Sequence, residues 1–107
     1  QVVLVPENVF FGASMTADDF HAGRWETSLA LALGPDDVDM ARAVDFAPPD
    51  VNRSELTNRP ISDFTPSGVW GYATQANQNE GAHLLGEMEN RLCVYVSGWL
   101  DQLRPGG

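Results

Sequence analysis

Lysine is absent from this sequence, cysteine occurs once, and no apolar run is long. Six arginines face fifteen aspartates and glutamates, so the formal net charge is −9. A strongly acidic chain is repelled by phosphate backbones and by anionic lipid headgroups. We therefore expect neither a nucleic-acid partner nor a membrane partner. The longest apolar runs, residues 2–5 and 29–33, are also far too short to cross a bilayer.

The single cysteine, Cys93, excludes an internal disulfide and with it a disulfide-stabilised scaffold. Cys93 lies in an apolar helical stretch, where a small buried side chain is the ordinary interpretation. No basic stretch followed by an apolar segment marks a signal peptide. These features favour a reducing compartment, and we expect a cytoplasmic protein. The 107 residues suffice for one small domain and not for two, so residues 1–107 are predicted to form a single unit.

The first half of the chain predicts one strand and one helix. Residues 2–5 form a short β-branched run, typical of a buried strand in a parallel sheet. A long loop follows over residues 6–20. Residues 23–33 predict a helix that is apolar nearly all round and should therefore be buried. Gly34 and Pro35 end this helix, the glycine through a left-handed cap.

The second half predicts irregular structure followed by one long helix. Residues 46–76 contain four of the seven prolines and should be mostly irregular, with brief extended pieces. A helix then runs from about Asn77 to Leu103, and Asn77 with Glu80 three residues later resembles a capping box. Glycines inside this helix are tolerated where another backbone packs closely. A stripe at three- or four-residue spacing predicts its core-facing side: Leu85, Met88, Leu92, Val96, Trp99 and Leu103.

Chemically useful side chains gather at the start of the first helix, over residues 18–28. His21 stands just before the helix, and Glu26 lies in its first turn. The partial positive charge at a helix N-terminus disfavours an imidazolium, so a neutral His21 is able to accept a proton or bind a metal. Spacing alone also allows the alternative that His21 and Glu26 are a helix-start pair that satisfies backbone donors. The tryptophans are predicted to pack, with Trp25 near enough to His21 to line a pocket, and His83 to be an ordinary face residue of the second helix.

Two segments carry a resemblance to the creatininase (creatinine amidohydrolase) family. The first is His21-Ala22-Gly23-Arg24-Trp25-Glu26-Thr27-Ser28-Leu29, followed by Leu31, Leu33 and Pro35-Asp36. It resembles the family pattern His-(Ala/Gly)-Gly-x-x-Glu-Thr-Ser, which precedes a leucine-rich helix and a Pro-Asp pair. The second is Gly68-Val69-Trp70-Gly71 with Thr74, Ala76 and Glu80-Gly81, which is similar to the family's Gly-x-x-Gly-x-x-Thr-x-Ala segment before its final helix. The two occur in the family's order and together cover most of residues 1–104.

The resemblance implies an α/β fold: a layered creatininase-like fold with a largely parallel sheet, of which this chain would be the C-terminal portion. It implies a metal-dependent amidohydrolase that hydrolyses a C–N bond of a small cyclic or linear amide. Such an enzyme uses a divalent metal, Zn or Mn, to activate water. The assembly is expected to be a homo-oligomer, a hexamer by resemblance.

The same resemblance implies roles for individual residues. His21 matches the acid/base that delivers a proton to the leaving nitrogen. Asp18 matches a position that contacts the substrate. Glu26 matches a residue close to the metal, which either binds the metal or contacts a residue that does. The expected substrate-binding residues are Asp18, Asp19, Arg24 and Trp25.

The chain also departs from the family. Phe20 stands where creatininase has a glutamate before the histidine, and Ala17 where it has the tryptophan of a substrate-covering loop, which argues against creatinine as the substrate. The family's metal ligands lie mainly in a Glu-x-His motif, a later Asp and a Gly-His motif, and this chain has none of these motifs. We therefore expect the chain alone to hold no metal. An N-terminal half or a companion chain should carry the remaining ligands.

Two other interpretations stay open. One is a non-catalytic oligomerising or regulatory remnant of the same fold. The other is an independent small binding domain in which both motifs match by accident. The enzyme and the remnant share this sequence, so a co-purifying polypeptide with Glu-x-His and Gly-His motifs would separate them.

Overall fold

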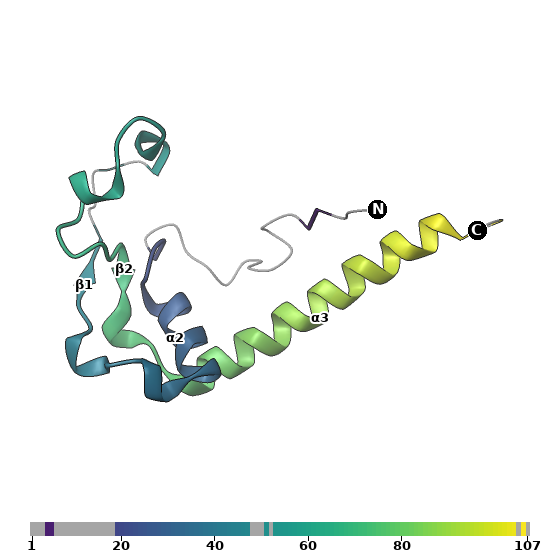
Figure 1. Ribbon diagram of the computed structural model, residues 1–107, viewed down its shortest axis with the longest axis horizontal. Helices are drawn as coiled ribbons and strands as arrows, with labels where there is room; N and C mark the ends of the chain where they lie inside the picture. Colours follow the sequence, from purple (N-terminus) through teal and green to yellow (C-terminus); the bar gives the residue numbers. More distant parts are fainter. Residues whose placement is uncertain (1–3, 6–18, 48–50, 52, 105, 107) are drawn as a thin grey trace.

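The computed structural model describes residues 4–5, 19–47, 51, 53–104 and 106. Two α-helices dominate this part of the chain, α2 (Arg24–Leu33) and α3 (Gln78–Leu103), and they pack against each other near the start of α3 (Figure 1). A small sheet joins β1 (Asp45–Phe46) to β2 (Gly71–Tyr72). Short 3-10 turns fill the connections: η1 (Pro35–Asp37), η2 (Met40–Arg42), η3 (Arg53–Thr57), η4 (Ile61–Asp63) and η5 (Ala73–Gln75).

The sheet differs from the one that the sequence predicts. Its two strands are antiparallel, with Asp45 opposite Tyr72 and Phe46 opposite Gly71, and a largely parallel sheet is not found in the described residues. Of the expected strand at residues 2–5, only the last two residues are described, and they lie outside any strand. Leu4 is 84% exposed. A parallel strand needs a neighbour joined to it by a long crossover, and no described segment supplies one.

Helix α2 begins one residue after the predicted start and ends at the predicted Leu33, but it does not have the predicted burial. The helix ends at Leu33, and the Gly34 N–H donates to the Ala30 carbonyl at 2.8 Å. Gly34 has φ −159°, so the predicted left-handed cap is wrong. Ser28 is the only buried residue of this helix, and Leu33 is 71% exposed. The apolar composition did not translate into burial because α3 packs against one side of α2 only.

Helix α3 begins as predicted, at an asparagine cap. The Asn77 side-chain oxygen accepts a hydrogen bond from the Glu80 N–H at 2.8 Å. The reciprocal half of the capping box is absent because the Asn77 N–H donates instead to the Ser28 hydroxyl, at 3.1 Å. The helix start is therefore tied to α2 as well as to its own first turn.

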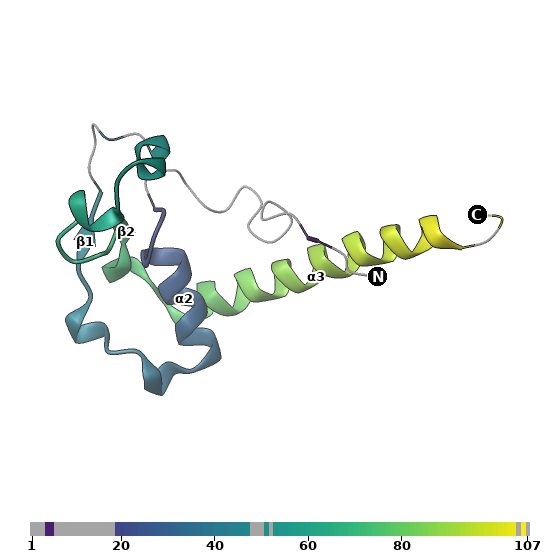
Figure 2. The ribbon, with the colours of Figure 1, turned by 45° about the horizontal axis from the view of Figure 1, so that its top comes forward.

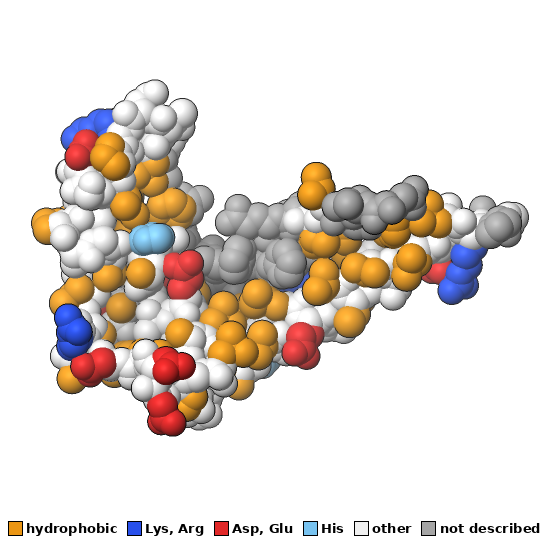
Figure 3. All heavy atoms as spheres, in the orientation of Figure 1, with side chains coloured by type: hydrophobic (Ala, Val, Ile, Leu, Met, Phe, Trp, Pro, Cys, Tyr) orange, Lys and Arg blue, Asp and Glu red, His pale blue; other side chains and the backbone are white. Residues whose placement is uncertain are grey.

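Most of α3 extends away from the body formed by α2 and the sheet (Figures 1 and 2). Ten residues of α2 span about 15 Å and the 26 residues of α3 about 39 Å, so α2 covers less than half of the longer helix. None of the six residues of the predicted stripe is buried, and hydrophobic side chains gather along α3 in Figure 3. The prediction that this stripe is core is wrong for this structure, as is the prediction that Cys93 is buried.

The buried core lies around Trp70, which is 2% exposed as its predicted packing role requires. The Phe20 ring meets the Trp70 ring edge-on at 5.6 Å, and Phe64 lies 6.0 Å away. Ala73 and Leu84 are the other buried apolar residues among those described. Neither described helix combines the length and hydropathy of a membrane span.

Candidate functional site

His21 sits in a turn that the backbone holds from both sides. Its N–H donates to the Trp70 carbonyl at 2.9 Å, and the Trp70 N–H donates to the His21 carbonyl at 2.8 Å. This pair is an isolated antiparallel bridge. The His21 side chain is exposed. The imidazole is therefore presented to solvent from a backbone fixed to the buried Trp70.

The next residue, Ala22, adopts a left-handed conformation with φ 52°. This conformation costs a residue with a Cβ about 1 kcal/mol, so neighbouring interactions must hold it. The Glu26 carboxylate accepts a hydrogen bond from the Ala22 N–H, and the Thr27 hydroxyl donates to the Ala22 carbonyl at 3.3 Å. Glu26 thus braces the turn that carries His21.

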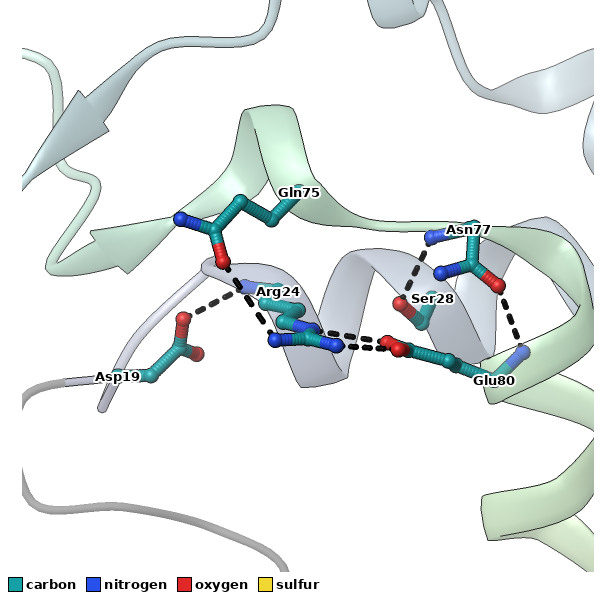
Figure 4. Close-up of polar contacts among 6 residues, drawn as sticks. All are labelled: Asp19, Arg24, Ser28, Gln75, Asn77 and Glu80. Carbon is teal, nitrogen blue, oxygen red and sulfur yellow. Dashed lines mark hydrogen bonds and ion pairs between the residues drawn. The ribbon is translucent and has the colours of Figure 1, made fainter.

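This bracing explains the Glu-Thr-Ser triplet residue by residue. Glu26 and Thr27 hold the turn, and Ser28 accepts the Asn77 N–H and so joins α2 to α3 (Figure 4). Sequence reasoning missed the roles of Thr27 and Ser28, although both belong to the motif. The predicted metal role of Glu26 stays a prediction. In this structure its carboxylate satisfies a backbone donor, which is the alternative that spacing alone left open.

Asp19 is placed differently from a substrate contact. It is 3% exposed, and its Oδ2 accepts the N–H groups of Arg24 and Tyr72, both at 2.9 Å. Figure 4 shows the carboxylate directed at the first turn of α2. Asp18, which was also predicted to contact the substrate, lies outside the described residues.

Arg24 is engaged in an ion pair between the two helices. Its Nε donates to Glu80 Oε2 at 2.8 Å, its Nη2 contacts Glu80 Oε1, and its Nη1 donates to Gln75 at 3.4 Å (Figure 4). The hydrogen bond to Glu80 raises the pKa of Arg24, and the hydrogen bond from Arg24 lowers the pKa of Glu80. The guanidinium also lies 4.9 Å from the centre of the Trp25 ring. The predicted substrate-binding role of Arg24 would thus compete with a structural one.

Trp25 lines a hollow of about 420 Å³ between the two helices, but His21 is not among the residues that line it. His83 does line this hollow. Its Nε2 lies 3.1 Å from Glu87 Oε1, and its side chain is 80% exposed. The sequence alone predicted no partner for His83. The spacing of four residues to Glu87 was the signal that could have found one.

A second hollow, of about 400 Å³, lies beside the turn that carries His21, and here too His21 itself is not among the lining residues. Ala22 and Thr27 form one side, and Val69 and Ala73 belong to the segment that pairs with the turn. Two charged residues, Asp39 and Arg42, also line it. A space of this size accommodates a small polar molecule next to the turn.

The described residues do not form a complete metal centre. No group of three or more histidine, cysteine, aspartate or glutamate side chains among them could hold a metal ion. Hydrolytic zinc sites use three protein ligands and leave a position for water. Near the turn, the described donors are His21, Glu26 and Asp19, and both carboxylates already accept backbone hydrogen bonds. This donor set does not fit a metal centre without ligands from elsewhere.

Comparison with known proteins gives one match. The family model of creatininase, described as creatinine amidohydrolase, matches residues 5–96. The match therefore takes in both motif segments and most of the printed chain. No curated protein and no solved structure matches.

Proposed function

Because this chain belongs to the creatininase family, a membership that implies a metal-dependent amidohydrolase-like function, we propose that it supplies the proton-transferring part of an amidohydrolase site. The proposed reaction is hydrolysis of a C–N bond in a small cyclic or linear amide. The observation that carries the proposal is the His21 turn, which presents an exposed imidazole from a backbone held by Trp70, Ala22 and Glu26.

His21 is the proposed acid/base. The neutral imidazole takes a proton from a water molecule as the water oxygen bonds to the amide carbon. The imidazolium then gives this proton to the departing nitrogen as the C–N bond breaks, so the imidazole is neutral again at the end. A fixed turn favours this role because proton transfer requires the donor within hydrogen-bond reach of the leaving atom. The hollow of about 400 Å³ lined by Ala22, the residue next to His21, is the proposed place for the substrate.

The remaining ligands for Zn or Mn are proposed to come from an N-terminal half or a companion chain. Two observations support an incomplete unit. The described donors do not make a metal centre. The radius of gyration is 16.9 Å, against about 13 Å for a compact domain of this length, and α3 extends from the body (Figure 2). The same proposal includes a homo-oligomeric assembly, a hexamer by resemblance.

The second candidate is a non-catalytic remnant that keeps the oligomerising or regulatory part of the fold. The lack of a three-donor group among the described residues agrees with this candidate as well as with an enzyme whose other ligands come from elsewhere. A remnant would keep the contact between α2 and α3 and the His21 turn, but no metal ligands would be supplied to the turn.

The deciding experiment combines native mass, metal content and activity on one preparation. The chain is purified from its own cells under native conditions, and the masses of all associated polypeptides are measured. The same sample is assayed with Zn or Mn against a panel of cyclic and linear amides that includes creatinine. A metal-containing assembly that hydrolyses any member supports the enzyme. A clean homo-oligomer without metal and without turnover supports the remnant.

A further inference from the structure

We propose that Asp19 is a positioning residue. It holds the His21 turn to the first turn of α2 and to β2, and it does not contact the substrate. The inference rests on the proposed function of His21 and assigns Asp19 a different role from the substrate contact that the sequence predicted. Its basis is the buried carboxylate and the backbone groups that surround it.

The Asp19 carboxylate joins two segments that are far apart in the sequence. One oxygen accepts the N–H of Arg24, in the first turn of α2, and the N–H of Tyr72, in β2, both at 2.9 Å. The residue is 3% exposed. A buried carboxylate is stable only when hydrogen bonds compensate its lost hydration, and these two donors provide them.

The same carboxylate caps α2. Gly23 occupies the N-cap position and has no side chain to accept the free N–H groups of the first turn. Asp19 accepts one of them from outside the helix, and its negative charge lies at the positive end of the helix. The helix cap and the hydrogen bond to β2 therefore share one acceptor atom, Asp19 Oδ2.

Two glycines make room for this arrangement. A Cβ on Gly23 would lie 2.4 Å from Asp19 Oδ1, and a Cβ on Gly71 would lie 2.8 Å from the carboxyl carbon. The glycines belong to the two separate family-like segments. Their close approach to one carboxylate gives a physical reason for glycine at both places.

His21 lies inside the loop that Asp19 closes. The N–H groups of Phe20 and His21 both donate to the Trp70 carbonyl, at 2.7 and 2.9 Å. Trp70 immediately precedes the Gly71-Tyr72 strand to which Asp19 is bonded. Losing the carboxylate would leave the turn held by Trp70, Glu26 and Thr27 but no longer tied to the Arg24 and Tyr72 backbone, so the backbone that carries the imidazole would be less firmly placed.

The test compares Asp19→Asn with Asp45→Asn in the active assembly. Asp45 is the matched control because it also accepts a backbone N–H, that of Thr74 at 2.9 Å, yet it is exposed. Asp19→Asn should lower kcat about tenfold to a hundredfold, with KM changed less than about twofold, because it disturbs orientation and not binding. Asp45→Asn should leave both constants near the wild-type values.

Amide hydrogen exchange gives a readout that does not depend on turnover. Exchange should become faster at both Arg24 and Tyr72 in Asp19→Asn and at Thr74 in Asp45→Asn. If Asp19→Asn does not fold, Gly23→Ala displaces the carboxylate without removing it and should give the same kcat loss and the same two exchange changes.

Two results separate this inference from the proposed function. A raised KM with unchanged kcat and unchanged exchange at Arg24 and Tyr72 would overturn the positioning role, because Asp19 would then act on the substrate. If exchange at both amides is faster in Asp19→Asn but His21→Ala keeps full activity, the contacts of Asp19 are supported and the proposed function of His21 is contradicted.

Discussion

The backbone of Gly81 in α3 lies directly against the carbonyl of Ser28 in α2. A Cβ at position 81 would sit 1.7 Å from the Ser28 oxygen. The Ser28 hydroxyl also accepts the Asn77 N–H at 3.1 Å, so the two helices meet through backbone and side chain at one point. This crossing fixes the position of α2, and with it the turn that carries His21.

Gly81→Ala should therefore force the helices apart. We expect the free energy of unfolding to fall by about 3 kcal/mol, the upper range for overpacking, because the clash is with backbone that cannot rotate away. Gly86→Ala is the control, since nothing lies within 4 Å of a Cβ there, and it should raise the free energy of unfolding by about 0.5–1 kcal/mol. Urea denaturation of both variants measures the difference, and equal effects would contradict the close crossing.

The Arg24–Glu80 pair predicts an acid-dependent loss of stability. The pKa of Glu80 is lowered in the folded state, so its contribution is present above the ordinary glutamate pKa of about 4.3 and is lost as the pH falls through the lowered value. Because both side chains are 32% exposed, the contribution should be no more than about 1 kcal/mol.

The measurement is the difference in unfolding free energy between wild type and Glu80→Gln from pH 7 to pH 2. The difference should shrink toward zero at the acid end. Glu89→Gln changes an exposed glutamate on the same helix and should show no comparable trend. A difference that stays constant over this pH range would exclude the ion pair as its source.

The two histidines should differ in their effect on turnover. His21→Ala in the active assembly is expected to lower kcat by about two to four orders of magnitude, the usual range for a lost acid/base. His83→Ala should leave kcat nearly intact, because His83 is an exposed partner of Glu87 on α3. Steady-state kinetics on the best amide of the panel compares them, and similar losses from both would count against His21.

Metal retention tests whether ligands come from outside the chain. The isolated chain, dialysed against a mild chelator, should keep no stoichiometric Zn or Mn, because too few donors converge among the described residues. The assembly with its companion segment should keep the metal under the same treatment. Elemental analysis of both samples decides, and a tightly bound metal in the isolated chain would mean that its own residues build the site.

Local sequence determined the two helices and the motif around His21. Asn77 caps α3 because its side chain reaches a backbone N–H three residues away, and α2 ends at Leu33 because Gly34 and Pro35 follow. Interactions within one turn depend on the spacing of residue types alone, which is why they could be predicted. The glycines of α3 predicted that another backbone packs closely against this helix. The structure shows such a contact at Gly81 but not at Gly86 or Gly98.

The tertiary structure alone decided which side chains were free for chemistry. Asp19 and Arg24 stand beside His21 in the sequence, but their partners Tyr72 and Glu80 lie 53 and 56 residues away. No local pattern identifies such partners, because they depend on where α2 crosses α3 and on how β2 returns to the turn. The burial of α2 and of the α3 stripe was misjudged for the same reason. Apolar spacing shows which face of a helix can be covered, and only the packing of a second segment determines whether it is.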